Sequence, residues 1–327
     1  MGAVEFRLLN DFQRCFPLAP EPYAVLAETL GVPVPDVLER LACLRDSGAV
    51  SRVGAVFRPG AIGASTLAAM AVPPDRLEAV AAIVSRFREV NHNYEREHRY
   101  NLWFVAAAAD EAALEALLDR IERSTGMDVL ALPLVEEYHI DLGFRLDGSG
   151  ERETRPPRAP ERATLDAADR RLVAALEDGL ELVPRPFAAL AARAGLDEAA
   201  AIERLARWVA DGVIRRFGVV VRHHELGYRA NAMVVWDVPD GVAPEYGRAL
   251  ATSEGVTLAY RRARHLPEWP YSLYCMLHGV DRGPVWERLD TLTRALGLEA
   301  FPRAVLFSRT RFKQTGARVA SREAAHG

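Results

Sequence analysis

The sequence predicts an α+β fold in which one two-module unit, a winged helix-turn-helix followed by a ferredoxin-like βαββαβ module, occurs twice in tandem. Two observations predict it. Identical residues recur at one constant offset, that of Pro22 and Pro186, along most of the chain. Within each repeat, apolar residues change from helical spacing to strand alternation in the same order. The length of 327 residues suits about two such repeats.

The repeat includes glycine and arginine positions as well as apolar ones. The matched residues include Leu26 and Leu190, Gly31 and Gly195, Arg40 and Arg204, Gly48 and Gly212, Arg52 and Arg216, Gly54 and Gly218, Arg58 and Arg222, and Gly63 and Gly227. We expect helix-turn-helix domains over residues 1–62 and 163–226, and ferredoxin-like domains over residues 63–146 and 227–318. Residues 147–162, rich in Gly, Pro and charge, are expected to form a linker, and residues 319–327 a disordered tail.

The first module of each repeat begins with two short helical patterns. In the first copy an apolar stripe over residues 25–30 ends at Gly31, and a second over residues 34–44 ends before Gly48. Residues 50–57 then alternate like a strand. The second copy repeats this order over residues 187–210, and residues 165–176 add a preceding helix. Helix, glycine turn, helix and strand are typical of a winged helix-turn-helix.

The second module of each repeat reads as βαββαβ, the ferredoxin-like order. In the first copy the expected strands cover residues 66–72, 90–94, 100–107 and 129–138, with helices over 75–87 and 110–121. In the second copy they cover residues 230–238, 256–262, 271–277 and 304–312, with helices over 243–253 and 281–296.

The charge pattern argues against DNA as a partner. The formal net charge is −4, and residues 36–50 carry three acidic against two basic side chains. Residues 197–211 carry four against two, and neither stretch contains Asn, Gln or Lys. Acidic reading helices would repel the duplex, so we expect no DNA binding.

Targeting and metal signals are absent from the sequence. No run approaches the ~18 apolar residues of a membrane helix, and residues 1–16 lack the apolar core of a signal peptide. Cys15, Cys43 and Cys275 lie far apart, without the spacing of a zinc site or a disulfide framework. We expect a cytoplasmic protein with no membrane partner.

The candidate site residues lie in two stretches, one in each copy, and at the wing strands. If residues 90–94 and 100–107 pair, they bring basic and aromatic side chains close to one hairpin. The first-copy candidates are His92, Tyr94, Arg96, His98, Arg99, Tyr100 and Trp103; the second-copy candidates are Tyr260, Arg261, Arg262 and Tyr271; the wing candidates are Arg58, Arg222 and His223. The alternative for one such hairpin is an ordinary solvated turn, but recurrence in both copies favours a site.

Basic and aromatic groups with few acids suit a flat, aromatic polyanion. Arginine binds carboxylates through two parallel hydrogen bonds, and aromatic rings pack on a macrocycle face. Histidine can donate a proton near neutral pH or bind iron.

Three segments resemble a known family. They are residues 92–104, which include His92-Asn93-Tyr94-Glu95-Arg96-Glu97-His98, residues 222–233, and residues 260–279, which include Pro267-Glu268-Trp269-Pro270-Tyr271. They resemble the siroheme decarboxylases of haem d1 and alternative haem biosynthesis, and the domain order resembles the Lrp/AsnC regulators. The tandem of two unlike copies is similar to the fused D–L form.

The resemblance implies removal of two acetate carboxyls, on rings C and D of siroheme, to give 12,18-didecarboxysiroheme. It implies no separate cofactor, because iron enters with the substrate. His92 and His98 would supply acid chemistry, or iron ligation in the case of His98, and Arg96 and Arg99 would hold carboxylates. The implied partners are siroheme and other proteins of haem d1 biosynthesis, and the expected assembly is a homodimer or a pseudo-dimeric monomer.

The second copy departs from the first. It carries a five-residue insertion in this stretch, and Thr257 or Leu258, not histidine, falls at the place of His92. We therefore expect the chemistry in the first copy, while the second binds substrate or shapes the dimer. Two other functions remain open from sequence: an Lrp/AsnC-like transcriptional regulator and a tetrapyrrole-binding protein without catalysis.

Overall fold

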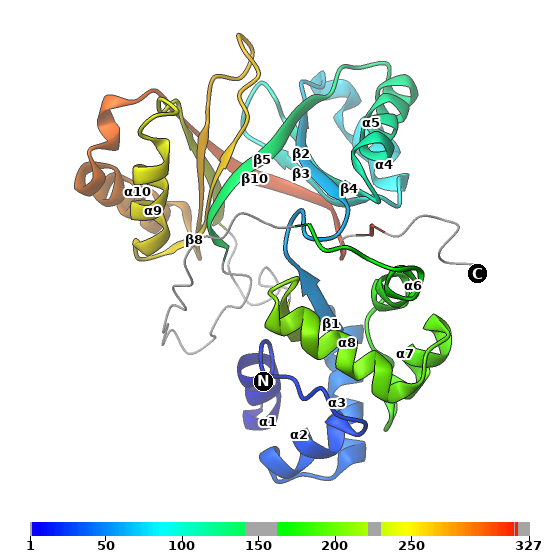
Figure 1. Ribbon diagram of the computed structural model, residues 1–327. Helices are drawn as coiled ribbons and strands as arrows, with labels where there is room; N and C mark the ends of the chain where they lie inside the picture. Colours follow the sequence, from blue (N-terminus) through cyan, green and yellow to red (C-terminus); the bar gives the residue numbers. More distant parts are fainter. Residues whose placement is uncertain (1, 141–161, 222–229, 317, 320–327) are drawn as a thin grey trace.

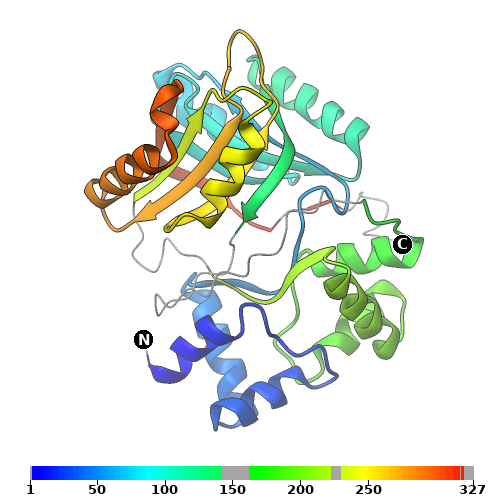
Figure 2. The ribbon, with the colours of Figure 1, turned by 60° about the vertical axis from the view of Figure 1, so that its left-hand side comes forward.

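The computed structural model describes residues 2–140, 162–221, 230–316 and 318–319. The linker expected over residues 147–162 lies outside the described residues except for Arg162, and so does the expected tail beyond Val319. Arg222 and His223, two of the candidate site residues, also lie outside them. The described chain forms two layers, in which a β-barrel stands over a pair of helix-turn-helix domains (Figures 1 and 2).

The helix-turn-helix layer contains two equivalent sets of elements. The first set is α1 (Ala3–Asp11), α2 (Pro22–Leu30), α3 (Val34–Asp46) and β1 (Val50–Phe57). The second is α6 (Ala167–Leu176), α7 (Pro186–Ala194), α8 (Glu198–Ala210) and β6 (Ile214–Val221). Helix α1, which the sequence pattern did not predict, is the counterpart of α6. Gly31 and Gly195 end α2 and α7 in the left-handed conformation that glycine adopts without strain.

The two wings join the two helix-turn-helix domains into one layer. Strands β1 and β6 pair antiparallel with Gly54 opposite Gly218, so the repeat-matched glycines meet at the centre of the wing sheet. Apolar side chains of both domains, from Leu8 to Val221, form one buried cluster beneath it. The two domains therefore fold against each other.

The barrel is built from both ferredoxin-like modules. The first contributes β2 (Ala64–Met70), η1 (Pro74–Arg76), α4 (Leu77–Arg86), β3 (Val90–Arg96), β4 (Leu102–Ala108), α5 (Glu111–Thr125) and β5 (Leu130–Ile140). The second contributes β7 (Ala230–Trp236), α9 (Ala243–Thr252), β8 (Val256–Arg262), β9 (Leu273–Gly279), α10 (Arg282–Leu296), η3 (Leu298–Ala300) and β10 (Arg303–Gln314). The βαββαβ order predicted for each copy is confirmed.

The last strand of each module closes the barrel. The strand order is β10-β3-β4-β2-β5-β8-β9-β7. Strand β5 pairs with β2 of its own module and with β8 of the other, and β10 pairs in the same way with β7 and β3. Each seam therefore contains a strand from each copy.

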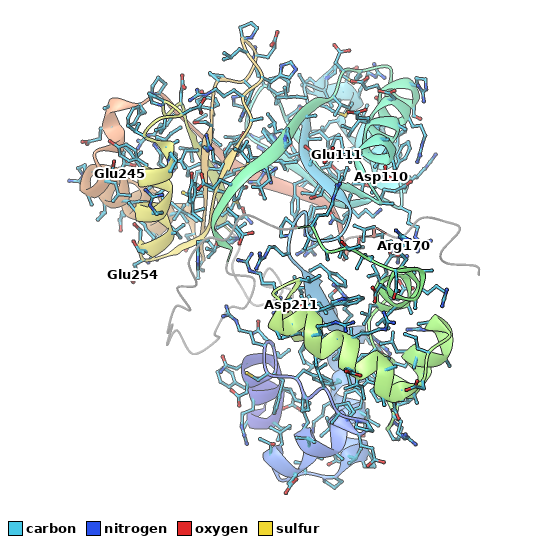
Figure 3. The ribbon with its side chains drawn as sticks, in the orientation of Figure 1. Asp110, Glu111, Arg170, Asp211, Glu245 and Glu254 are labelled. Atoms are coloured by element: carbon cyan, nitrogen blue, oxygen red, sulfur yellow. The ribbon has the colours of Figure 1, made fainter. Side chains whose placement is uncertain are left out.

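Helices cover the outside of the barrel, with α4 and α5 on one side and α9 and α10 on the other (Figure 1). Asp110 starts α5, as the sequence predicted, by accepting the amide hydrogen of Ala113 at 2.8 Å (Figure 3). Outward-facing side chains pack under the helices in two clusters, whereas inward-facing ones form a third cluster inside the barrel. In the part of the chain that the structure describes, no helix has the length and apolar character needed to cross a membrane.

Candidate active site

The two candidate histidines lie at opposite ends of β3. His92 is near the start of the strand, while His98 follows its last residue, Arg96, in the hairpin. At ~3.3 Å per residue, His92 and Arg96 are about 13 Å apart along the strand, and His98 lies farther on. The two imidazoles therefore belong to different surroundings and cannot act on one atom together.

His92 faces the inside of the barrel at the end nearest the wings. It pairs with Val105 of β4 and Gln314 of β10. Its Nδ1 is buried and has no hydrogen-bond partner among the described residues. Burial, and secondly the positive charge of Arg52, lower the pKa of His92 to about 4. The imidazole is therefore neutral at pH 7 in the unliganded protein.

Arg52 reaches this position from the wing strand β1. Its guanidinium lies beside Gly316, just beyond the Gln314 that pairs with His92. It donates a hydrogen bond to the carbonyl oxygen of Ala55 at 2.9 Å. The helix-turn-helix layer thus contributes a cation to the barrel end where His92 lies.

Two further arginines point into the barrel from equivalent positions in the two copies. Arg96 donates to the carbonyl oxygen of Leu306 at 3.1 Å, and Arg262 to that of Leu132 at 2.7 Å. Within the described chain neither forms an ion pair with a carboxylate. Arg96 lies 5.9 Å from the ring centre of Tyr94, and Arg262 lies 4.7 Å from that of Tyr260.

Burying a guanidinium without a nearby anion is unfavourable, because the charged group loses its hydration and gains no ion pair. Burial lowers the pKa of Arg96 below its ordinary value. Tyr94 and Arg262 keep some contact with solvent although they face inward, as do Val105 and Leu258. Solvent therefore reaches the interior at these side chains, while Arg96 is buried behind them, and an anionic ligand that enters here could pair with the two arginines.

The other end of the barrel is closed by aromatic packing around Trp269, which is fully buried. Trp103 and Tyr271 lie with ring centres 5.1 and 4.9 Å from that of Trp269, and Tyr100 at 5.9 Å. His98 accepts the amide hydrogen of Tyr100 on Nδ1 at 3.1 Å, and burial followed by the charge of Arg99 lowers its pKa. These side chains contact one another rather than His92.

The remaining candidates lie apart from both groups. Arg58 follows β1 and donates its backbone N–H to Val213 at 2.9 Å, with its side chain beside Gly212. Arg99 is exposed and donates to the carbonyl oxygen of Glu268 at 2.7 Å. Arg261 lies 3.6 Å from carboxylate oxygens of both Glu136 and Asp240. Acidic or carbonyl groups already engage Arg99 and Arg261.

The strand register settles which residue replaces His92 in the second copy. His92 pairs with Val105 two residues before Tyr94 pairs with Trp103, and Leu258 pairs with Met276 two residues before Tyr260 pairs with Tyr274. Leu258 is therefore the counterpart of His92, and Thr257 lies at the irregularity beside it.

The two halves of the wing-facing end also differ in charge. Arg311 is opposite Tyr94 where the second copy places Glu137 opposite Tyr260. Glu137 forms an ion pair with Arg215 of β6. The half that contains His92 thus has an arginine at this register position, and the equivalent half has a glutamate that is paired with an arginine.

A second histidine, His278 on β9, lies on the second-copy side of this end. Its Nδ1 is 3.0 Å from Oγ1 of Thr257, and its Nε2 is 3.1 Å from Nδ2 of Asn231. Both ring nitrogens are engaged, unlike Nδ1 of His92. No group of three or more His, Cys, Asp or Glu in the described ranges is arranged to hold a metal ion.

Sequence reasoning missed Arg52, Arg311 and Gln314 as residues at the wing-facing end of the barrel. Arg52 carried a signal, because Arg216 matches it in the repeat. Arg311 and Gln314 carried none, since they belong to the second copy and reach His92 only through the pairing of β10 with β3.

Comparison with known proteins agrees with this architecture. A family model described as "Siroheme decarboxylase NirDL-like HTH domain" matches residues 5–50 and 169–215, and one described as "AsnC-like ligand binding domain" matches residues 61–139 and 225–313. The siroheme decarboxylase NirDL subunit of Paracoccus denitrificans is 44% identical over 320 residues, covering 98% of both chains.

The chain belongs to the siroheme decarboxylase family. Its relatives in this family include proteins of about half its length. The NirD subunit of Pseudomonas aeruginosa is 54% identical over 149 residues, which are 46% of this chain and 99% of that one.

Solved siroheme decarboxylases share the whole fold. The crystal structure of a NirDL protein superposes with a TM-score of 0.70 at 29% identity, covering 98% of this chain and 96% of that one. A second NirDL crystal structure, in complex with an iron-uroporphyrin III analogue, gives a TM-score of 0.69 at 28% identity and covers 98% and 95%. The Lrp/AsnC-like tandem architecture predicted from sequence is confirmed by the family models and by these structures.

Proposed function

We propose that this chain is a siroheme decarboxylase whose substrate lies inside the barrel, with the reacting acetates toward His92 at the wing-facing end and other carboxylates toward Arg96 and Arg262. The observation that carries the proposal is the pair of inward-facing guanidiniums, Arg96 and Arg262, which have no carboxylate partner in the described chain. Siroheme is planar and carries eight carboxylates, so it can supply the missing anions. Family membership supports this substrate.

The proposed reaction converts two acetate side chains, on rings C and D, into methyl groups, giving 12,18-didecarboxysiroheme. In each step a proton adds to the pyrrole carbon next to the one that bears the acetate, and the resulting cationic ring acts as an electron sink. The bond to the carboxylate then breaks, CO2 leaves, and the electron pair of that bond forms an exocyclic double bond to the ring. A proton then adds to the side-chain carbon and the ring carbon loses its own, so one proton is consumed for each CO2 released.

His92 is the proposed general acid. Its pKa of about 4 leaves it neutral before substrate binds. A bound carboxylate nearby raises that pKa, because negative charge favours the imidazolium. Substrate binding would thus load the acid with its proton, and positioned general acids accelerate reactions by ~10²–10⁴-fold.

Arg96 and Arg262 would orient the macrocycle by binding carboxylates, with Tyr94 and Tyr260 beside them. His98, which the resemblance offered as an iron ligand, lies at the closed end of the barrel beside Trp269 with Nδ1 accepting the Tyr100 amide, so the proposed site does not include it. An unchanged Soret band of bound siroheme in His98→Ala would support this placement. We propose that no separate organic cofactor takes part, so purified protein and siroheme alone should suffice.

The test is anaerobic incubation of the purified protein with siroheme, followed by mass spectrometry of the pigment. We expect a product lighter by two CO2 and an activity lower by ~10²-fold or more in His92→Ala. Full activity in His92→Ala would contradict its assignment as the acid. Siroheme that binds and is recovered unchanged would show a carrier, and salt-sensitive binding of a DNA duplex without turnover would show a regulator.

A further inference from the structure

The wing strand β1 of the first copy brings Arg52 to the barrel end where His92 lies, and this contact has no role yet. A barrel of two ferredoxin-like modules closes without a helix-turn-helix layer. The repeat offers an internal comparison. Arg216, the counterpart of Arg52 on β6, is buried and donates to Oε1 of Gln13 at 3.3 Å. Arg52 differs, since its described hydrogen bond goes to a backbone carbonyl of its own strand.

The path of the Arg52 side chain is built into the surrounding backbone. A methyl group added at Gly179 would lie 2.8 Å from Cβ of Arg52, and one added at Gly316 would lie 2.7 Å from Nη1. Glycine at these two positions leaves room for the arginine to cross from the wing to β10. The backbone after β10 is held in place by the Thr315 N–H, which donates to the carbonyl oxygen of Asn91 at 2.7 Å.

The charge around Arg52 is not balanced. Asp178 is the acidic group that acts on it, and Arg318 acts on it with the opposite sign. Asp178 is exposed and already pairs with Arg318 at 2.7 Å. Two guanidiniums thus share one carboxylate next to a neutral His92, and the buried Nε of Arg52 has no hydrogen-bond partner among the described residues.

We propose that Arg52 binds one carboxylate of the tetrapyrrole beside His92, so that the wing of the first helix-turn-helix domain is part of the substrate site. This inference rests on the proposed function and adds a binding residue to it. The carboxylate is one that stays on the product. A guanidinium on the departing carboxylate would stabilise the ground state more than the transition state and slow the loss of CO2.

In the described part of the second wing, no arginine is placed to bind a carboxylate in this way. Its Arg216 is turned to Gln13, and its other inward charge, Arg215, pairs with Glu137 of the barrel. The wing of the first copy therefore binds substrate, while the wing of the second copy contacts the barrel through the ion pair of Arg215 with Glu137. The asymmetry matches that of His92 and Leu258, and it places all the proposed chemistry on one side of the pseudo-symmetric molecule.

The experiment measures binding of iron uroporphyrin III, an octacarboxylate tetrapyrrole, by Soret titration of the full chain. Charged hydrogen bonds contribute about 1.5–3 kcal/mol, so Arg52→Gln should raise Kd roughly 10- to 100-fold. Arg52→Lys, which keeps the charge without the fork, should recover part of the loss. The control is Arg45→Gln, an equal charge change at an exposed residue of α3 that pairs with Asp46.

Turnover of siroheme gives the second readout. Arg52→Gln should raise KM more than it lowers kcat, because the contact persists from substrate to product. A Kd for Arg52→Gln equal to that of Arg45→Gln would overturn the proposal, as would a loss confined to kcat. Because the titration needs no turnover, Arg52-dependent binding without release of CO2 would refute the proposed function and leave this inference standing.

Discussion

At the scale of single residues, the proposed chemistry depends on a histidine kept neutral and on arginines that have no acidic partner in the described chain. The two conditions are linked, because burial, and secondly the charge of Arg52, depress the pKa of His92. We propose that an anionic substrate offsets the charge of Arg52. His92 would then take a proton only when a carboxylate is bound.

The depressed pKa of His92 predicts a pH dependence of stability. Between about pH 6.5 and pH 4 the unfolded chain binds a proton at this histidine that the folded chain does not. The associated stability is present above pH 6.5 and is lost as the pH falls toward 4, by at most about 1.4 kcal/mol per pH unit. Urea unfolding at pH 7.5 and pH 5 should show a smaller loss for His92→Asn than for the parent chain. Equal losses of unfolding free energy in the two proteins would contradict a depressed pKa at His92.

At the scale of elements, strands β3 and β8 present arginine at equivalent places, and both guanidiniums lack an acidic partner in the described chain. Replacing Arg96 by methionine removes a buried charge, although it also leaves the carbonyl of Leu306 without its donor. We expect Arg96→Met to unfold at equal or higher urea concentration while it binds iron uroporphyrin III more weakly. Arg99→Met, at the exposed hairpin, serves as the control. A strongly destabilised Arg96→Met with normal binding would indicate a structural arginine.

The sequence was informative wherever a signal was local. Alternation and helical spacing predicted both βαββαβ modules, and the repeat predicted two copies of each domain. The closure of the two modules into one barrel could not be predicted from the sequence. It depends on the pairing of β10 with β3 of the other copy, which leaves no pattern in either segment. His92 was singled out because it belongs to a local cluster of basic and aromatic residues. Arg311 and Gln314 were not, because only the pairing of β10 with β3 brings them to the same end of the barrel. The aromatic residue Trp103 was taken for part of the ligand surface, but the structure packs it against Trp269.

At the scale of the whole molecule, the barrel joins the pairing edges of both modules within one chain. No strand of the described barrel is left with an open edge, so the described β-structure has no edge for a second copy to extend. We propose that the protein is a pseudo-dimeric monomer in solution rather than a homodimer. Light scattering after size-exclusion chromatography should give the mass of one chain across a tenfold range of concentration. A mass that doubles with concentration would favour the homodimer.

The seams of the barrel have a consequence for how the protein tolerates being cut. Because β5 and β10 each complete the sheet of the other copy, neither half has a finished sheet by itself. Covalent connection turns their meeting into an intramolecular event, with an effective concentration in the millimolar range for short flexible tethers. Two separately expressed halves would have to associate by diffusion. Dilution would then lower the activity of the divided enzyme and leave the activity of the continuous chain unchanged.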